Sequence, residues 1–328
     1  QLSPLLYDLT SLQREANGRF GFSAKATLGL AQALYEKHKA LTYPRTDSRA
    51  LPEDYLATVR STLGMLEQTR YGAFASQILQ REWVRPNKRI FNDAKVSDHF
   101  AIIPTSQAPR HLNEQEAKLY DLVTRRFLAV FYPAAEFLVT TRITRVAGEP
   151  FKSEGKVLVN PGWLAVYGKD AQPDDAPNLA PVQPGETVRT ASVEVVAAQT
   201  KPPARFTEAT LLSAMEGAGK LVEDEELREA MRDKGLGTPA TRAQIIEGLL
   251  YEKYLVRQGR DLQPTAKAFS LIALLRGLAI PELSSPELTG DWEFKLRRMA
   301  RGQMQRAEFM KEIADMTREI VAKAKQHE

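Results

Sequence analysis

The sequence contains no cysteine among its 328 residues. This absence excludes disulfide bonds, cysteine-ligated zinc sites and thiol catalysis. Histidine is scarce as well, and the four residues lie too far apart in the chain to form a paired His-x-His metal motif: His38, His99, His111 and His327. No apolar run approaches the roughly 20 residues of a membrane-spanning helix, and no signal peptide is present. We therefore expect a cytoplasmic protein without a membrane partner.

The overall composition is that of an ordinary globular protein, with 43% hydrophobic and 26% charged residues. A chain of this length can build two or three domains with separate cores. The net charge of +4 is mildly basic, so it permits a nucleic-acid partner without requiring one. Because the chain begins at Gln1 without an initiator methionine, we expect a fragment of a longer protein.

The patterns along the chain predict a multidomain α+β protein with three domains. Residues 1–133 carry mainly helical patterns, interrupted by one extended segment that contains Tyr43. Residues 134–204 change to strand-like alternation and predict a small antiparallel β unit. Residues 205–328 return to helices. Their order of helix, basic hairpin with Gly259 near its tip, and helix is typical of a winged-helix arrangement.

Local signals place several of these elements. Asn113 and Glu116 form a capping box before a long helix that stops ahead of Pro133. A second capping box is predicted from Thr10 and Gln13, with the short helix closing at Asn17-Gly18. Strands are predicted over residues 137–143, 156–159, 163–167 and 187–197.

The segment that most suggests chemistry is LTYPRTDSR, residues 41–49. Pro44 biases Tyr43 towards an extended conformation, so Tyr43 is expected to end a strand with its phenol pointing away from the chain path. Arg45 and Arg49 add guanidinium groups of the kind that hold phosphate oxygens. Tyrosine can act as a nucleophile through a covalent intermediate. Taken alone, the segment also fits an ordinary Tyr-Pro turn without catalysis.

Four blocks together resemble the type IA DNA topoisomerases, and the topoisomerase III branch in particular. In chain order they are LTSLQREAN with RFGFS within residues 9–23, LTYPRTDSRALPEDY at 41–55, SDHFAIIPT at 97–105, and GLGTPATRA at 235–243. The resemblance implies an ATP-independent isomerase that changes DNA topology by relaxation or decatenation, at the nucleoid of a bacterial cytoplasm. It also implies the family's core fold.

The resemblance assigns roles to three side chains. Tyr43 would attack a phosphate of single-stranded DNA and form a 5′-phosphotyrosine. Arg45 would stabilise charge on the transition-state phosphate, although it also fits a solvated turn arginine. His99 would bond a neighbouring phosphate or orient another group. Its apolar surroundings in the sequence equally fit a histidine of the core.

DNA backbone contacts are expected where the GLGTPATRA block begins a helix. Backbone N–H groups and the positive end of the helix dipole favour phosphate at such a terminus. The candidate residues are Thr238, Thr241 and Arg242, with Arg19 and Arg49 as further candidates. An ordinary capped helix is the alternative for the first three. A solvated charge at Arg19 and a turn-shaping role at Arg49 are the alternatives for the others.

The resemblance also implies Mg²⁺, held in the family by an acidic TOPRIM domain with an Asp-x-Asp-x-Glu motif. That motif is absent from this sequence, so the metal ligands are absent and no metal-binding residue is assigned. We therefore expect the TOPRIM region of the parent enzyme to be a required partner. Without it the family's ring would be incomplete, and these 328 residues would be inactive or weakly active alone.

Two other classes of protein also use the features found here. Tyrosine recombinases need a His-x-x-Arg box, but Ile102 and Glu114 stand three positions after His99 and His111. The remaining alternative is a non-catalytic, winged-helix-like DNA-binding module over residues 205–328. It would bind duplex DNA without residues 1–133, whereas a purely structural domain would show no salt-dependent binding of nucleic acid.

Overall fold

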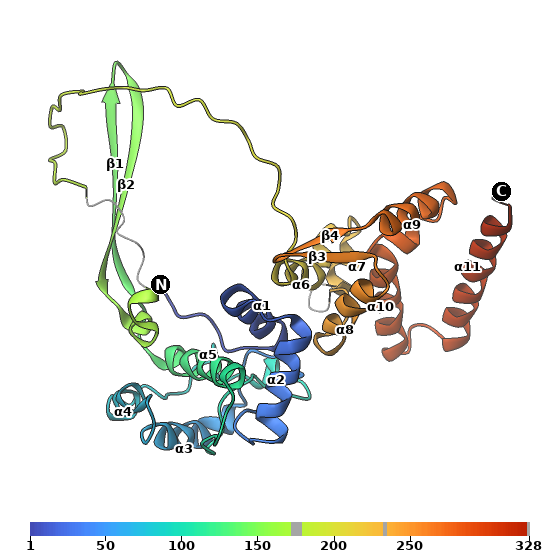
Figure 1. The fold of residues 1–328 in the computed structure, drawn as a ribbon, viewed down its shortest axis with the longest axis horizontal. Helices are drawn as coiled ribbons and strands as arrows, with labels where there is room; N and C mark the ends of the chain where they lie inside the picture. The colour runs from blue at the N-terminus through green and yellow to red at the C-terminus, as the bar shows by residue number, and fades with distance from the viewer. Residues whose placement is uncertain (172–178, 232–234, 327–328) are drawn as a thin grey trace. The chain divides into compact units, whose positions relative to one another are not determined.

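The structure, a computed structural model, describes residues 1–171, 179–231 and 235–326 (Figure 1). These residues form helices and two separate two-stranded sheets, β1–β2 and β3–β4, each antiparallel. The mixture of helices with small antiparallel sheets agrees with the predicted α+β class. Among the described residues, no helix combines the length and the apolar character needed to cross a membrane.

The chain divides into two compact units, each assembled from three stretches of sequence. The first unit contains Gln1–Tyr7, Leu34–Tyr43 and Ser48–Pro203. The second unit contains Asp8–Ala33, Pro44–Asp47 and Ala204–Glu328.

This division does not coincide with the three predicted domains, because no boundary falls between residues 133 and 134 and residues 44–47 belong to the second unit. The predicted boundary between residues 204 and 205 lies one residue from the boundary between Pro203 and Ala204 in the structure. Residues 8–33, however, belong with the C-terminal stretch rather than with residues 34–133. Inside the second unit, Ala209 N donates to Asn17 Oδ1 at 3.2 Å, and Arg14 pairs with Glu216 at 3.2 Å. Such contacts join residues about 200 positions apart, so local patterns could not reveal them.

The first unit is built on α5 (Glu114–Phe131), whose buried residues include Leu119, Val123 and Phe127. The predicted capping box is confirmed, because Glu116 N donates to Asn113 Oδ1 at 2.8 Å and Asn113 N donates to Glu116 Oε2 at 2.9 Å. The other elements are α3 (Leu56–Leu66), α4 (Gly72–Gln80), β1 (Glu136–Val146), β2 (Glu149–Asn160), and the 3₁₀ helices Glu53–Tyr55, Asp93–Lys95 and Gly162–Ala171.

The β unit is smaller than predicted. It consists of the β1–β2 hairpin, which projects away from α3, α4 and α5 (Figure 1). The strand predicted over 163–167 is wrong, because that stretch lies in the 3₁₀ helix Gly162–Ala171 and buries Trp163. Arg125 of α5 also donates to Val166 O at 2.6 Å. The strand predicted over 187–197 is wrong as well, since those residues are exposed and pair with no strand.

The second unit contains α1 (Leu9–Phe20), which begins earlier and ends later than predicted. Its N-cap is Asp8, and Ser11 N donates to Asp8 Oδ1 at 2.7 Å, so the box predicted from Thr10 and Gln13 is wrong. Asn17-Gly18 does not close the helix. Gly21 does, with φ of +70°, a conformation that glycine adopts without steric cost.

The core of the second unit lies where three helices meet. Ala24 of α2 (Ala24–Glu36) packs with Leu212 and Met215 of α6 (Glu208–Glu216) and with Ala243 and Ile246 of α8 (Pro239–Tyr251). The remaining elements are α7 (Glu225–Met231), β3 (Leu255–Gln258), β4 (Asp261–Pro264), α9 (Ala266–Gly277), α10 (Glu287–Ala300), α11 (Arg306–Gln326), and the 3₁₀ helices Ala218–Leu221 and Pro281–Ser284.

The predicted order of helix, hairpin and helix is confirmed as α8, β3–β4 and α9. Gln258 pairs with Asp261 around Gly259, whose φ is +63°. The name winged-helix for this arrangement stays a prediction.

Candidate active site

The backbone that carries Tyr43 is held against the segment 101–105 in the first unit. Leu41 forms an isolated antiparallel bridge with Pro104, and Thr105 N donates to Ala40 O at 3.0 Å. The strand predicted to end at Tyr43 is therefore reduced to a single bridge. The HFAIIPT block supplies the partner for this bridge, so two of the four sequence blocks meet here.

Thr42 is the most connected residue of this pairing, and sequence reasoning assigned it no role. Its N–H donates to Ile103 O at 3.0 Å. Its hydroxyl donates to Ala101 O at 3.0 Å and accepts from Ile103 N at 2.9 Å. Three hydrogen bonds thus fix the backbone immediately before Tyr43.

The ring of Tyr43 lies between two other rings. His99 is tilted against it, with centroids 4.3 Å apart and an interplanar angle of 42°. Tyr35 meets it edge-on, with centroids 5.4 Å apart and an angle of 79°. Tyr43 is half-buried and His99 is exposed. The fold therefore brings together two of the three predicted catalytic residues, which stand 56 positions apart in the sequence.

The third predicted catalytic residue, Arg45, lies in the Pro44–Asp47 stretch of the second unit and is exposed. This stretch is anchored by Thr46, which is buried and accepts a hydrogen bond from Leu9 N at 3.0 Å. Arg49 lies in the first unit and is half-buried.

The start of α8 carries the predicted phosphate contacts Thr238 and Thr241. Thr238 is an exposed N-cap, and its N–H donates to Thr241 Oγ1 at 2.8 Å. Gly237 precedes it with φ of +67°, and a Cβ there would lie 3.0 Å from Ile245 Cδ1. The GLGTPATRA block therefore builds a tight, glycine-dependent helix start, in which the Thr241 hydroxyl closes the cap.

Arg242 does not fit the predicted direct contact with DNA, because it is only 3% exposed. Its Nε donates to Leu236 O at 3.1 Å, and its Nη1 donates to Thr10 Oγ1 at 2.9 Å. Burial lowers the pKa of this guanidinium from its ordinary value. Three carboxylates oppose that shift, those of Glu216, Asp8 and Asp47. Arg242 is thus a positioning residue that joins the block to α1.

Other basic residues of the second unit are held by acceptors of the unit itself. Arg19 is exposed and pairs with Glu15 at 3.0 Å along α1. Arg257 of β3 pairs with Glu208 at 2.7 Å and with Glu247 at 2.6 Å. A phosphate would have to compete with these carboxylates for either arginine.

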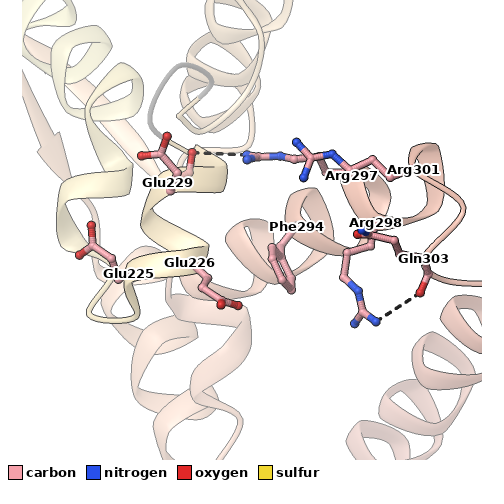
Figure 2. Close-up of a pocket in the computed structure, with 8 residues that line it drawn as sticks. All are labelled: Glu225, Glu226, Glu229, Phe294, Arg297, Arg298, Arg301 and Gln303. Carbon is pink, nitrogen blue, oxygen red and sulfur yellow. Dashed lines mark hydrogen bonds between the residues drawn. The ribbon is translucent and has the colours of Figure 1, made fainter.

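A cavity of about 440 Å³ between α7 and α10 was not foreseen from the sequence. Figure 2 shows the glutamates of α7 on one side of Phe294 and the arginines of α10 on the other. Arg297 Nη2 donates to Glu229 O at 3.3 Å, and Arg298 Nη2 donates to Gln303 O at 3.3 Å. Because carboxylates form one wall, this cavity is a poor site for phosphate.

Within residues 1–171, 179–231 and 235–326, no group of three or more histidine, aspartate or glutamate side chains could hold a metal ion. The expectation of Mg²⁺ rests on the family resemblance.

Comparison with known proteins decides the family. The family model described as DNA topoisomerase matches residues 1–311. The chain belongs to this family. DNA topoisomerase 3 of Bacillus subtilis strain 168 is 44% identical over 334 residues, and that of Bacillus cereus ATCC 14579 is 42% identical over the same length. The topoisomerase III-like assignment is therefore confirmed.

Both alignments cover 98% of the chain but only 45% of the relative, so the chain spans less than half the length of these curated relatives. The full-length topoisomerase I of Thermotoga maritima has a similar fold, with a TM-score of 0.68 and 24% identity. That match covers 99% of this chain and 50% of the other.

Proposed function

We propose that this chain carries the nucleophile of a type IA DNA topoisomerase, which cleaves and rejoins one DNA strand through Tyr43. The observation that carries the proposal is the ring contact between Tyr43 and His99, centroids 4.3 Å apart, on a backbone fixed by Thr42. Membership of the DNA topoisomerase family supports it.

The proposed reaction exchanges one phosphodiester for another. Tyr43 Oη attacks the phosphorus of single-stranded DNA, the Oη–P bond forms and the P–O3′ bond breaks. The phenolic proton goes to solvent, and the leaving 3′ oxygen takes up a proton. The 3′ hydroxyl later attacks the 5′-phosphotyrosine and releases Tyr43. Because one ester replaces another of similar energy, no ATP is needed to reseal the strand.

The neighbouring groups would act on the phosphate. His99 is exposed beside the Tyr43 ring, so its imidazole can donate a hydrogen bond to a phosphate oxygen next to the attacked position. Arg45 is exposed and would stabilise negative charge on the transition-state phosphate. Thr238 and the N-terminus of α8 would contact the DNA backbone, while Arg242 holds that terminus in place.

We further propose that the activity requires the parent enzyme's TOPRIM region and Mg²⁺, and that it serves DNA at the nucleoid in the cytoplasm. No step above uses the metal. The chain alone would bind single strands and cleave them weakly or not at all.

The test is covalent capture of DNA. A single-stranded oligonucleotide labelled at its 3′ end is mixed with this chain and Mg²⁺, with and without a separately produced TOPRIM fragment, and denatured before electrophoresis. We expect labelled DNA on the protein when the TOPRIM fragment is added. Tyr43→Phe should abolish the adduct, whereas Tyr35→Phe, which keeps the neighbouring ring, should retain it.

The outcomes separate the proposals. An adduct in Tyr43→Phe would exclude Tyr43 as the nucleophile. An adduct without the TOPRIM fragment would exclude the required partnership. Binding without any adduct, together with duplex binding that survives deletion of residues 1–133, would favour the non-catalytic module over the enzyme.

A further inference from the structure

A second cavity, of about 630 Å³, lies in the first unit and is basic. Its lining residues are Lys37, His38, Gln107, Ala108, Arg110 and His111. We call it the Lys37 cavity. It differs from the cavity between α7 and α10 because no carboxylate belongs to its lining.

The Lys37 cavity is built from the same two segments that hold Tyr43. Lys37 and His38 precede the Tyr43 segment, and residues 107–111 follow the segment 101–105. The segments are joined between the cavity and the tyrosine, since Thr105 Oγ1 donates to Lys39 O at 2.6 Å. Five residues of extended chain span at most about 18 Å, so the Cα atoms of His38 and Tyr43 can be no farther apart.

The polar groups of the cavity suit an anion. Lys37 and Arg110 are exposed basic side chains that offer several N–H donors. The His38 side chain is 6% exposed, and its Nε2 has no hydrogen-bond partner of adequate geometry. The nearest acid to it is Glu116, whose Oε2 lies 3.3 Å from Nε2. Glu116 is itself buried and accepts from Asn113 N, which is the main cause of its lowered pKa, with smaller contributions from His38 and Lys37. It offsets part of the positive charge beside His38, whereas Lys37 and Arg110 are exposed at the cavity.

We propose that the Lys37 cavity binds a backbone phosphate of the DNA strand that Tyr43 cleaves, a few nucleotides from the cleaved bond. Lys37 and Arg110 supply the charge, and Gln107 supplies an amide donor at the rim. Contacts of this kind position a strand without reading its sequence. The inference rests on the proposed function, because it takes the same strand as the ligand.

The test compares two double variants, each of which removes two positive charges. Lys37→Ala/Arg110→Ala removes the two charges of the cavity. The control Arg81→Ala/Arg85→Ala removes two exposed arginines elsewhere in the first unit. Binding of a fluorescent single-stranded oligonucleotide is measured by anisotropy over a range of KCl concentrations, and circular dichroism checks that each variant folds.

In the cavity variant, the slope of log affinity against log salt concentration should become less steep by about 0.7 to 1.4. This is the change expected when one or two single-strand phosphate contacts are lost. If the plots for the wild type and the cavity variant meet at 1 M salt, this change of slope corresponds to binding that is about 4- to 14-fold weaker in the variant at 0.15 M salt. The control should match the wild type, and Lys37→Arg/Arg110→Lys should restore the slope.

Equal slopes for the cavity variant and the control would overturn the inference, even if wild-type binding and the Tyr43 adduct uphold the proposed function. Titration with inorganic phosphate identifies the source of the anion. Tight binding of inorganic phosphate by the wild type, with no change in DNA binding in the variant, would mean a site for a free anion and would overturn the DNA assignment. Salt-independent DNA binding by the wild type would also overturn the inference, whereas the proposed function is tested separately by the Tyr43 adduct.

Discussion

The residue that most directly controls the placement of Tyr43 is Thr42, and Thr42→Val tests this. Valine keeps the branched shape of threonine but replaces the hydroxyl by a methyl group. The change removes the hydrogen bond to Ala101 O at 3.0 Å and the one from Ile103 N at 2.9 Å. Both partner residues are buried, with exposures of 0% and 1%.

The loss of stability in Thr42→Val follows from those two hydrogen bonds. A hydrogen bond contributes about 0.5–1.5 kcal/mol net, so losing two lowers the free energy of unfolding by about 1–3 kcal/mol. Thr42 itself is half-buried, so water can reach part of the site and the lower half of that range applies. With a urea dependence of about 2 kcal/mol/M, the midpoint of unfolding should fall by about 0.5–1 M.

Tryptophan fluorescence can follow the first unit in a Trp292→Phe background, because Trp83 and Trp163 both belong to that unit. Thr42→Ser keeps the hydroxyl and serves as the control. The rate of adduct formation should fall by as much as about 100-fold in Thr42→Val, since small misplacements of a reacting group are costly. A Thr42→Val protein with wild-type stability and adduct rate would refute the assigned role.

Three further changes probe other contacts. Arg242→Met should lower the free energy of unfolding by about 2–4 kcal/mol, read from urea unfolding, because it leaves a buried hydroxyl and a carbonyl unpaired. Weaker DNA binding at unchanged stability would instead indicate a direct contact. The hydrogen bond from the Asn113 N–H is the main cause of the lowered pKa of Glu116. The ionised carboxylate therefore stabilises the fold at pH values above 4.5, its ordinary pKa. This contribution is lost as the pH falls through the lower pKa that Glu116 has in the folded protein. Glu116→Gln should therefore cost about 1 kcal/mol in urea unfolding at pH 7, and the difference should shrink as the pH falls below 4.5. Gly237→Ala should cost about 1–2 kcal/mol because of its φ of +67°, whereas Gly29→Ala, in an open helical position, should not destabilise.

The chemistry-bearing segments could be found from the sequence because each is a short block with its own residue types. The Tyr43 segment and the HFAIIPT block were identified separately, and the helix starts at Thr207, Thr238 and Thr265 follow from side chains that bond within three residues. The contact between Tyr43 and His99 did not follow from either block. It exists because the two segments lie side by side in the first unit.

Where the predictions failed, a distant partner decided the outcome. Trp163 has strand-like neighbours, yet its stretch forms a 3₁₀ helix in which its ring is buried. The start of α8 carries Arg242 at a position that looks exposed in the sequence, but the side chain reaches Thr10, which is 232 residues away.

The sequence alone therefore determined the capping box at Asn113 and the β3–β4 hairpin, because those depend on groups within a few residues of one another. It also singled out Tyr43 as the proposed nucleophile. The tertiary structure decided which basic residues remain available to a phosphate. Arg242 is buried, Arg257 is held by two carboxylates, and Lys37 and Arg110 line an open basic cavity. Availability depends on burial and on nearby opposite charge, and both are set by residues that are far away in the sequence and close in space.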